Sequence, residues 1–197
     1  MLMLIAGFAI ARYPFAFDRT IILALHDSGS SWLRPAMIDI TALGGGTILT
    51  IVVLVASGLM LVHRHAMTAL LLVVATVSGA QGVQVLKRVF ARMRPDVVDH
   101  IVQVSGNSFP SGHSADSAIV YLTLAGLATQ VVRGVAVRRY IVGIAIFLVG
   151  AIGVSRVYLG VHWPSDVLAG WSFGTLWALA WWLAGAKARA SLRGARR

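Results

Sequence analysis

Long apolar stretches separated by short polar clusters dominate the chain, and their lengths give the first structural expectation. Three stretches of about 20 residues carry no charged side chain: residues 40–62, 66–86 and 167–186. At about 1.5 Å per residue, a helix of that length crosses the roughly 30 Å hydrocarbon core of a bilayer. Residues 117–132 and 140–155 are shorter apolar stretches, which span if their polar flanks reach the interfaces. The pattern predicts an all-α, polytopic membrane helix bundle.

The N-terminal segment is the least regular of these stretches. Residues 1–11 are apolar but too short to span, and extension to Phe17, with Arg12 reaching toward the interface, gives a short first span. The tripeptide Ala9-Ile10-Ala11 is typical of a signal-peptide cleavage site, but no basic region precedes the apolar run, which favours the span. We therefore expect about six transmembrane helices in a single domain over residues 1–197.

The composition supports a membrane protein and excludes several other classes. Hydrophobic residues make up 58% and charged residues 12% of the chain, whereas a soluble domain needs about a quarter of its residues charged. The chain has no cysteine, which excludes thiol chemistry. Much of the net charge of +10 lies in segments that six spans would leave in the cytoplasm, together with both termini. Because no nucleic-acid motif accompanies this charge, we expect a plasma-membrane bilayer, and no nucleic acid, as its partner.

Three polar clusters interrupt the apolar pattern, and the predicted topology brings all three to the extracytoplasmic face. Residues 87–95 follow the third span, residues 109–114 open the fourth, and residues 155–166 join the fifth to the sixth. Charged groups at a membrane are costly, so their convergence on one leaflet predicts a functional site.

The first cluster offers two cations at helical spacing. Lys87 and Arg94 are seven residues apart, which places them on one helix face if the helix continues until Pro95 ends it. Long side chains at that spacing can converge on one anion. The planar guanidinium of an arginine suits phosphate oxygens, so we expect an anion here.

The second cluster, Pro110-Ser111-Gly112-His113, opens a predicted helix. Free backbone N–H groups at a helix start attract anions. Gly112 allows the backbone to approach a ligand closely, Ser111 adds a hydroxyl donor, and His113 can donate a proton.

The third cluster pairs a histidine with a carboxylate. His162 and Asp166 are four residues apart, so the carboxylate reaches the imidazole if the turn is helical, with Pro164 near the first helical position. Such a pair fixes the tautomer and frees the other ring nitrogen to attack. Arg156 adds a further cation.

In order, the clusters read Lys-x6-Arg-Pro, Pro-Ser-Gly-His and Ser-Arg-x5-His-x3-Asp. This ordered triple resembles the three-part signature of the type 2 phosphatidic acid phosphatase (PAP2) superfamily, and its motifs lie within residues 87–166. The resemblance implies a metal-independent lipid phosphatase that uses no cofactor. It implies that His162 attacks phosphorus and forms a phosphohistidine, that Asp166 orients it, and that His113 protonates the leaving oxygen and then activates water. The phosphate-binding groups that it implies are Lys87, Arg94, Ser111, Gly112 and Arg156.

The substrate expected from the resemblance is a phosphate monoester or diphosphate of a lipid. Polyprenyl diphosphate, phosphatidic acid and phosphatidylglycerol phosphate lead, and family analogy slightly favours undecaprenyl diphosphate. The oligomeric state and the physiological lipid cannot be read from the sequence.

Three alternatives stay open. A metal-dependent phosphohydrolase would use Asp96, Asp99 and His100, with His113 and Asp116 nearby, but the aspartates are scattered and the chain has no glutamate. Vanadate-dependent haloperoxidases share the residue pattern but are soluble. A non-enzymatic anion or lipid binder, or a transporter, suits basic residues at a membrane but has no need of the histidine–aspartate pair. Asp116 itself tunes His113 or caps the helix.

Overall fold

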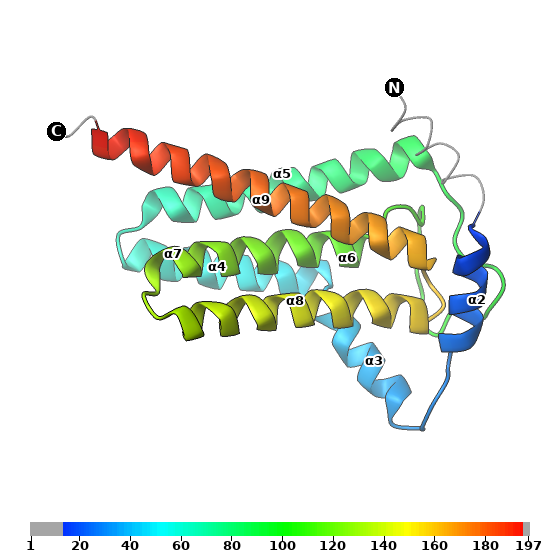
Figure 1. The fold of residues 1–197 in the computed structure, drawn as a ribbon. Coiled ribbons are helices and arrows are strands. Elements are labelled where there is room, and N and C mark those ends of the chain that lie inside the picture. Colours follow the sequence, from blue (N-terminus) through cyan, green and yellow to red (C-terminus); the bar gives the residue numbers. More distant parts are fainter. Residues whose placement is uncertain (1–13, 195–197) are drawn as a thin grey trace.

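The computed structural model describes residues 14–194, which fold into a bundle of helices without a strand in that range (Figure 1). The helical elements are α2 (Ala16–Leu25), α3 (Leu33–Ala42), α4 (Gly46–Val62), α5 (Ala66–Phe90), α6 (Gly112–Ser117), the π-helical turn η1 (Ala118–Leu122), α7 (Thr123–Val131), α8 (Val135–Tyr158) and α9 (Pro164–Gly194). The all-α expectation is therefore confirmed.

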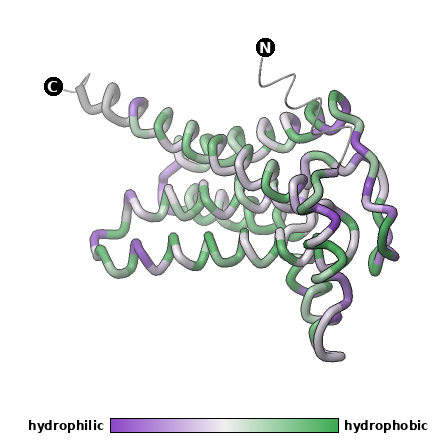
Figure 2. The backbone as a smooth tube through the Cα atoms, turned by 45° about the vertical axis from the view of Figure 1, so that its right-hand side comes forward, coloured by the Kyte–Doolittle hydropathy of each residue, from purple (hydrophilic) through white to green (hydrophobic). Residues whose placement is uncertain are grey.

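The long helices α4, α5, α7, α8 and α9 run alongside one another, while α2 and α3 lie at one end of the bundle (Figure 1). Hydrophobic positions follow the lengths of these helices, and hydrophilic positions gather toward their ends (Figure 2). Large apolar side chains on the outside stay uncovered: Val62 is 78% exposed and Phe147 is 69% exposed. Such surface is costly in water and suits the hydrocarbon of a bilayer.

Among residues 14–194, three helices are long and apolar enough to cross a membrane: α5, α8 and α9 through Lys187. The helices α3 and α4, bent by 49° at their junction, make a fourth candidate if they form one span. Residues 112–131 are helical throughout, but α6, η1 and α7 divide them. The expected first span falls mostly on residues 1–13, which lie outside the described range. A total of six spans therefore stays a prediction.

Glycines at the α3–α4 junction let the chain pack closely on the helices beside it. A Cβ atom on Gly44 would lie 2.5 Å from Cγ2 of Ile152 and 3.3 Å from the carbonyl oxygen of His113. Real Cβ atoms do not approach other atoms that closely, so glycine is required at position 44, where the α3–α4 junction packs against α6 and α8. This contact holds the junction against His113.

Close packing of α9 on the 112–122 helical segment gives a first prediction. A Cβ atom on Gly174 would lie 2.6 Å from the Ala115 carbonyl oxygen and 2.6 Å from Cβ of Ala118. We expect Gly174→Ala to lower the free energy of unfolding by about 1–3 kcal/mol, because overpacking forces helices apart. The measurement is the thermal midpoint in detergent. Gly58→Ala is the control, since a Cβ atom there meets nothing within 4 Å. An unchanged midpoint for Gly174→Ala would contradict this account of the packing.

Candidate active site

The three polar clusters meet at a hollow of about 540 Å³ at the end of the bundle where α3 lies. Six of the eight residues predicted for the site line it: Lys87, Arg94, Gly112, His113, Arg156 and His162. They come from the last turn of α5, the loop after it, the first turn of α6, the last turn of α8 and the loop before α9. The convergence expected from the sequence is therefore present in the fold, although it joins segments that lie far apart along the chain.

Arg94 reaches the hollow by a different route from the predicted one. The sequence analysis placed it on the same helix face as Lys87, but α5 ends at Phe90 because Ala91 adopts a left-handed conformation with φ of 46°. That expectation was wrong. The helix stops five residues before Pro95, and Arg94 lies in the loop that follows.

Backbone carbonyls hold the guanidinium of Arg94 in place. Nη1 donates to the carbonyl of Val161 at 2.8 Å, Nη2 to that of Ser105 at 2.8 Å, and Nε to that of Gly106 at 3.1 Å. The same Nη1 lies 3.3 Å from Nε2 of His162. The cation is thus fixed beside the imidazole by contacts on both sides of the hollow.

His162 is buried between a cation and a carboxylate. Its Nδ1 lies 3.4 Å from Oδ2 of Asp166, and Pro164, the first residue of α9, starts the helical turn that carries this pair. Burial lowers the pKa of His162 from 6.5 to about 3, so the ring is neutral at neutral pH. With the Nδ1 proton directed at Asp166, the Nε2 lone pair faces the basic hollow, as a nucleophile requires.

Asp166 lies behind His162 and does not line the hollow. Its carboxylate is fully buried and accepts hydrogen bonds from the Ser108 hydroxyl and, at 2.9 Å, from the backbone N–H of Trp163. Its other oxygen, Oδ1, lies 2.8 Å from Nη1 of Arg92. A carboxylate held by this many donors is both ionised and fixed in orientation.

Arg92 connects Asp166 to a second buried carboxylate on α2. Its Nη2 lies 3.2 Å from Oδ2 of Asp18, and the exposures of the two side chains are 3% and 0%. Asp18 also accepts 2.7 Å hydrogen bonds from the backbone N–H and the hydroxyl of Ser165. Four residues of this network were not predicted from the sequence: Arg92, Asp18, Ser108 and Ser165. The run Arg92-Met93-Arg94 was a possible signal for Arg92, but nothing local marks Asp18.

Two of the predicted phosphate-binding residues have distinctive surroundings. Ser111 is fully buried and does not line the hollow; its N–H donates to the Asp166 carbonyl at 3.0 Å, and its hydroxyl accepts from Ser114. Arg156 donates from Nη1 to the Thr41 hydroxyl at 2.8 Å. Its buried Nε has no hydrogen-bond partner among residues 14–194, so this donor is unsatisfied.

Asp116 also lines the hollow, together with Gln84 and Arg88, which the sequence analysis did not assign to the site. Across the described residues, no three histidine or aspartate side chains gather closely enough to hold a metal ion. His100 instead bonds the backbone carbonyl of Pro95 at 2.8 Å.

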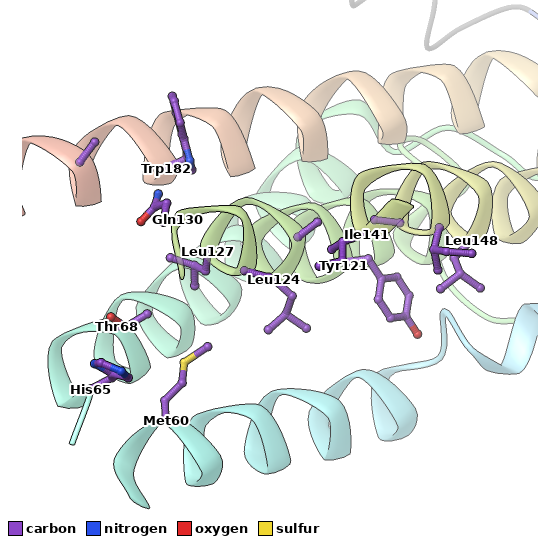
Figure 3. Close-up of a pocket in the computed structure, with 15 residues that line it drawn as sticks. Met60, His65, Thr68, Tyr121, Leu124, Leu127, Gln130, Ile141, Leu148 and Trp182 are labelled. Carbon is purple, nitrogen blue, oxygen red and sulfur yellow. The ribbon is translucent and has the colours of Figure 1, made fainter. Parts of the chain in front are cut away.

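A larger hollow of about 900 Å³ opens elsewhere, between α4, α5, α7, α8 and α9 (Figure 3). Its lining is mostly apolar and includes Met60, Leu124, Leu127, Ile141 and Leu148. No residue of the three clusters lines it.

Comparison with known proteins decides the family. The sequence profile described as PAP2 superfamily matches residues 66–190, which is more than half of the chain. The chain belongs to the PAP2 superfamily. The resemblance seen in the three motifs is thereby confirmed, as is the expectation of an enzyme that acts on lipid phosphates.

Two relatives and one solved structure support this membership. Phosphatidylglycerophosphatase B of Bacillus subtilis is 35% identical over 147 residues, which cover 74% of this chain and 71% of the relative. Decaprenylphosphoryl-5-phosphoribose phosphatase of Mycobacterium tuberculosis is 33% identical over 112 residues, 55% of this chain and 56% of the relative. The crystal structure of a transmembrane PAP2 type phosphatidylglycerolphosphate phosphatase from Bacillus subtilis superposes with a TM-score of 0.85 at 30% identity, covering 94% of both chains.

Proposed function

We propose that this PAP2 protein hydrolyses a phosphate monoester or diphosphate of a lipid through a phosphohistidine at His162. The observation that carries the proposal is the position of His162, whose Nε2 faces Arg94 in a basic hollow while Nδ1 faces Asp166. The names of the relatives given above describe them as phosphatases of lipid phosphates. Two of these names, both of Bacillus subtilis proteins, suggest phosphatidylglycerol phosphate as the substrate.

The reaction has two balanced steps. In the first, the Nε2 lone pair of His162 forms an N–P bond, the P–O bond to the lipid breaks, and His113 gives its proton to the departing oxygen. In the second, His113 takes a proton from water, the water oxygen bonds phosphorus, and the N–P bond breaks to free His162 and inorganic phosphate. Asp166 stabilises the charge that develops on the imidazole in each step.

The phosphoryl oxygens would be held by Lys87, Arg94 and Arg156, with the backbone of Gly112. Ser111, the fifth group that the resemblance implies, is fully buried and does not line the hollow. Phosphoryl transfer depends on positioning and on neutralising spread negative charge, and three cations around one hollow meet that need. The unpartnered Nε of Arg156 is a donor of the kind that a phosphate oxygen would satisfy.

We further propose one domain with six spans and the site on the extracytoplasmic side of the plasma membrane. The six would be an N-terminal span, the bent pair α3–α4, α5, the helical run 112–131, α8 and α9. Arg64 and Arg133, in the loops at the end opposite the hollow, and Arg138 and Arg139 beside them, support a cytoplasmic location for that end.

The test is phosphate release by the purified protein from phosphatidylglycerol phosphate, phosphatidic acid and undecaprenyl diphosphate, each with and without EDTA. We expect release that resists EDTA and follows saturation kinetics on at least one lipid. Release abolished by EDTA would favour the metal-dependent alternative. A folded protein that releases no phosphate from any of the three lipids would support an anion binder or transporter.

A further inference from the structure

Asp116 is a carboxylate in a hollow that is otherwise built for an anion. It lines that hollow together with Lys87, Arg94 and Arg156, yet it would repel a phosphate dianion and so cannot be a phosphate ligand. Its Oδ1 is buried and has no hydrogen-bond partner among residues 14–194. Lys87, the nearby cation, donates to the carbonyl of Asn107 at 2.7 Å. The proposed phosphatase mechanism leaves this carboxylate without a role, and a buried acceptor without a donor is costly.

The position of Asp116 is the second observation. It lies one helical turn after Gly112, and its Oδ2 is 3.9 Å from where a Cβ atom on Gly112 would stand. It also lines a second, apolar hollow of about 270 Å³ between α4, α5 and η1, whose other lining residues include Leu49, Val77 and Ile119. Asp116 and Gly46 are the residues that both hollows share.

A lipid phosphate bound across this junction passes Asp116 with a defined part of its structure. Its phosphoryl group would lie among the cations, its hydrocarbon tail would lie in the apolar hollow, and the atoms that link them would lie beside the carboxylate. In a prenyl phosphate these linking atoms are hydrocarbon, and in a prenyl diphosphate they include a second anionic phosphate. In a glycerol phosphate whose second carbon is not acylated, a hydroxyl stands on the carbon next to the one that carries the phosphate.

We propose that Asp116 is a specificity-determining residue that accepts a hydrogen bond from this neighbouring hydroxyl, and so selects lipids phosphorylated on a polyol. The inference rests on the proposed phosphatase function and narrows its substrate class. A hydroxyl would give this carboxylate a hydrogen-bond donor, a prenyl carbon would give it none, and a second phosphate would add repulsion. The name of the Bacillus subtilis relative, which contains glycerophosphate, is consistent with this class for that protein. Undecaprenyl diphosphate, slightly favoured from the sequence, becomes the weaker candidate.

The test compares two substrates that differ by one hydroxyl group. They are 1-oleoyl-glycerol-3-phosphate, which has a free hydroxyl next to the phosphorylated carbon, and its 2-deoxy analogue, each presented in the same detergent micelles. We expect the wild type to have a kcat/KM about tenfold higher for the hydroxylated substrate, since a site built around a substrate hydroxyl rejects the analogue that lacks it. Asp116→Ala should bring the ratio close to one by losing activity mainly on the hydroxylated substrate. Asp116→Asn, which keeps an acceptor, should retain part of the preference.

Asp39→Ala is the matched control, because Asp39 is exposed on α3 and lines neither hollow; its ratio should equal that of the wild type. Equal kcat/KM values of the wild type on the two substrates would overturn the role of Asp116 while leaving the phosphatase function intact. This comparison needs no variant, so it decides the matter even if Asp116→Ala does not fold. A folded wild type that hydrolyses neither of these substrates nor any lipid of the earlier panel would overturn the proposed function and this inference together.

Discussion

Replacement of His162 by alanine is expected to lower the kcat of phosphate release by at least about 10³-fold on every lipid that the wild type hydrolyses. The imidazole is the group whose free nitrogen faces the basic hollow, with Arg94 at 3.3 Å on one side and Asp166 behind it. Without it, water would have to attack the lipid phosphate directly, although the cations would still bind the phosphate. We therefore expect kcat to collapse while the affinity for a lipid phosphate, measured by competition, changes little.

His63→Ala is the matched control, because this histidine lies exposed at the C-terminal end of α4, away from the hollow. Its activity should match that of the wild type. A second readout separates covalent catalysis from direct attack by water: acid-labile, base-stable phosphoprotein should form from labelled substrate in the wild type and should be absent in His162→Ala. Residual activity of His162→Ala within tenfold of the wild type, in a folded sample, would rule out His162 as the nucleophile.

Most of the helices and most of the residues that line the active-site hollow could be predicted from the sequence, because both depend on local signals. Charge-free stretches of spanning length correspond to α5 and α9, and a third, residues 40–62, runs from the end of α3 through α4 with a bend between them. The site residues could be predicted because a charged group at a membrane is costly and therefore indicates a functional site. Lys87, His113 and His162 also belong to short motifs of fixed spacing. These signals need no knowledge of how the helices pack.

What the sequence did not indicate depends on backbone conformation and on contacts between distant segments. A helix end at Ala91 is not signalled by an alanine, which rarely adopts a left-handed conformation, so the helix was extended to Pro95. The division of residues 112–131 by η1 likewise leaves no mark in an apolar pattern. Arg92 holds Asp166 and is itself paired with Asp18. Arg92 and Asp18 are 74 residues apart in the sequence, and a pairing at that separation is visible only in the fold.

Arg92 is the residue of that support whose loss should matter most. It is 3% exposed and lies between two fully buried carboxylates, so Arg92→Met would leave Asp18 and Asp166 charged, buried and without a cation. Removing one partner of a buried ion pair typically costs about 3–5 kcal/mol of folding free energy. The same change would release the Asp166 carboxylate from one of the donors that orient it toward His162. A displacement of about 1 Å in a catalytic group can reduce the rate by about 10²-fold, so we expect a loss of that order in kcat.

The kinetic constants distinguish a positioning role from a merely structural one. Arg92 does not line the hollow, so KM should stay near the wild-type value while kcat falls in the folded fraction of Arg92→Met. Arg92→Lys should restore part of the stability, because it keeps the positive charge. It should restore little of kcat, because the guanidinium contacts Asp166 with one nitrogen and Asp18 with another, whereas an ammonium group has a single nitrogen. Arg34→Met is the control: its ion pair with Asp27 is about half exposed, and such pairs are worth at most about 1 kcal/mol. A raised KM with unchanged kcat in Arg92→Met would mean that Arg92 binds substrate and does not position the catalytic pair.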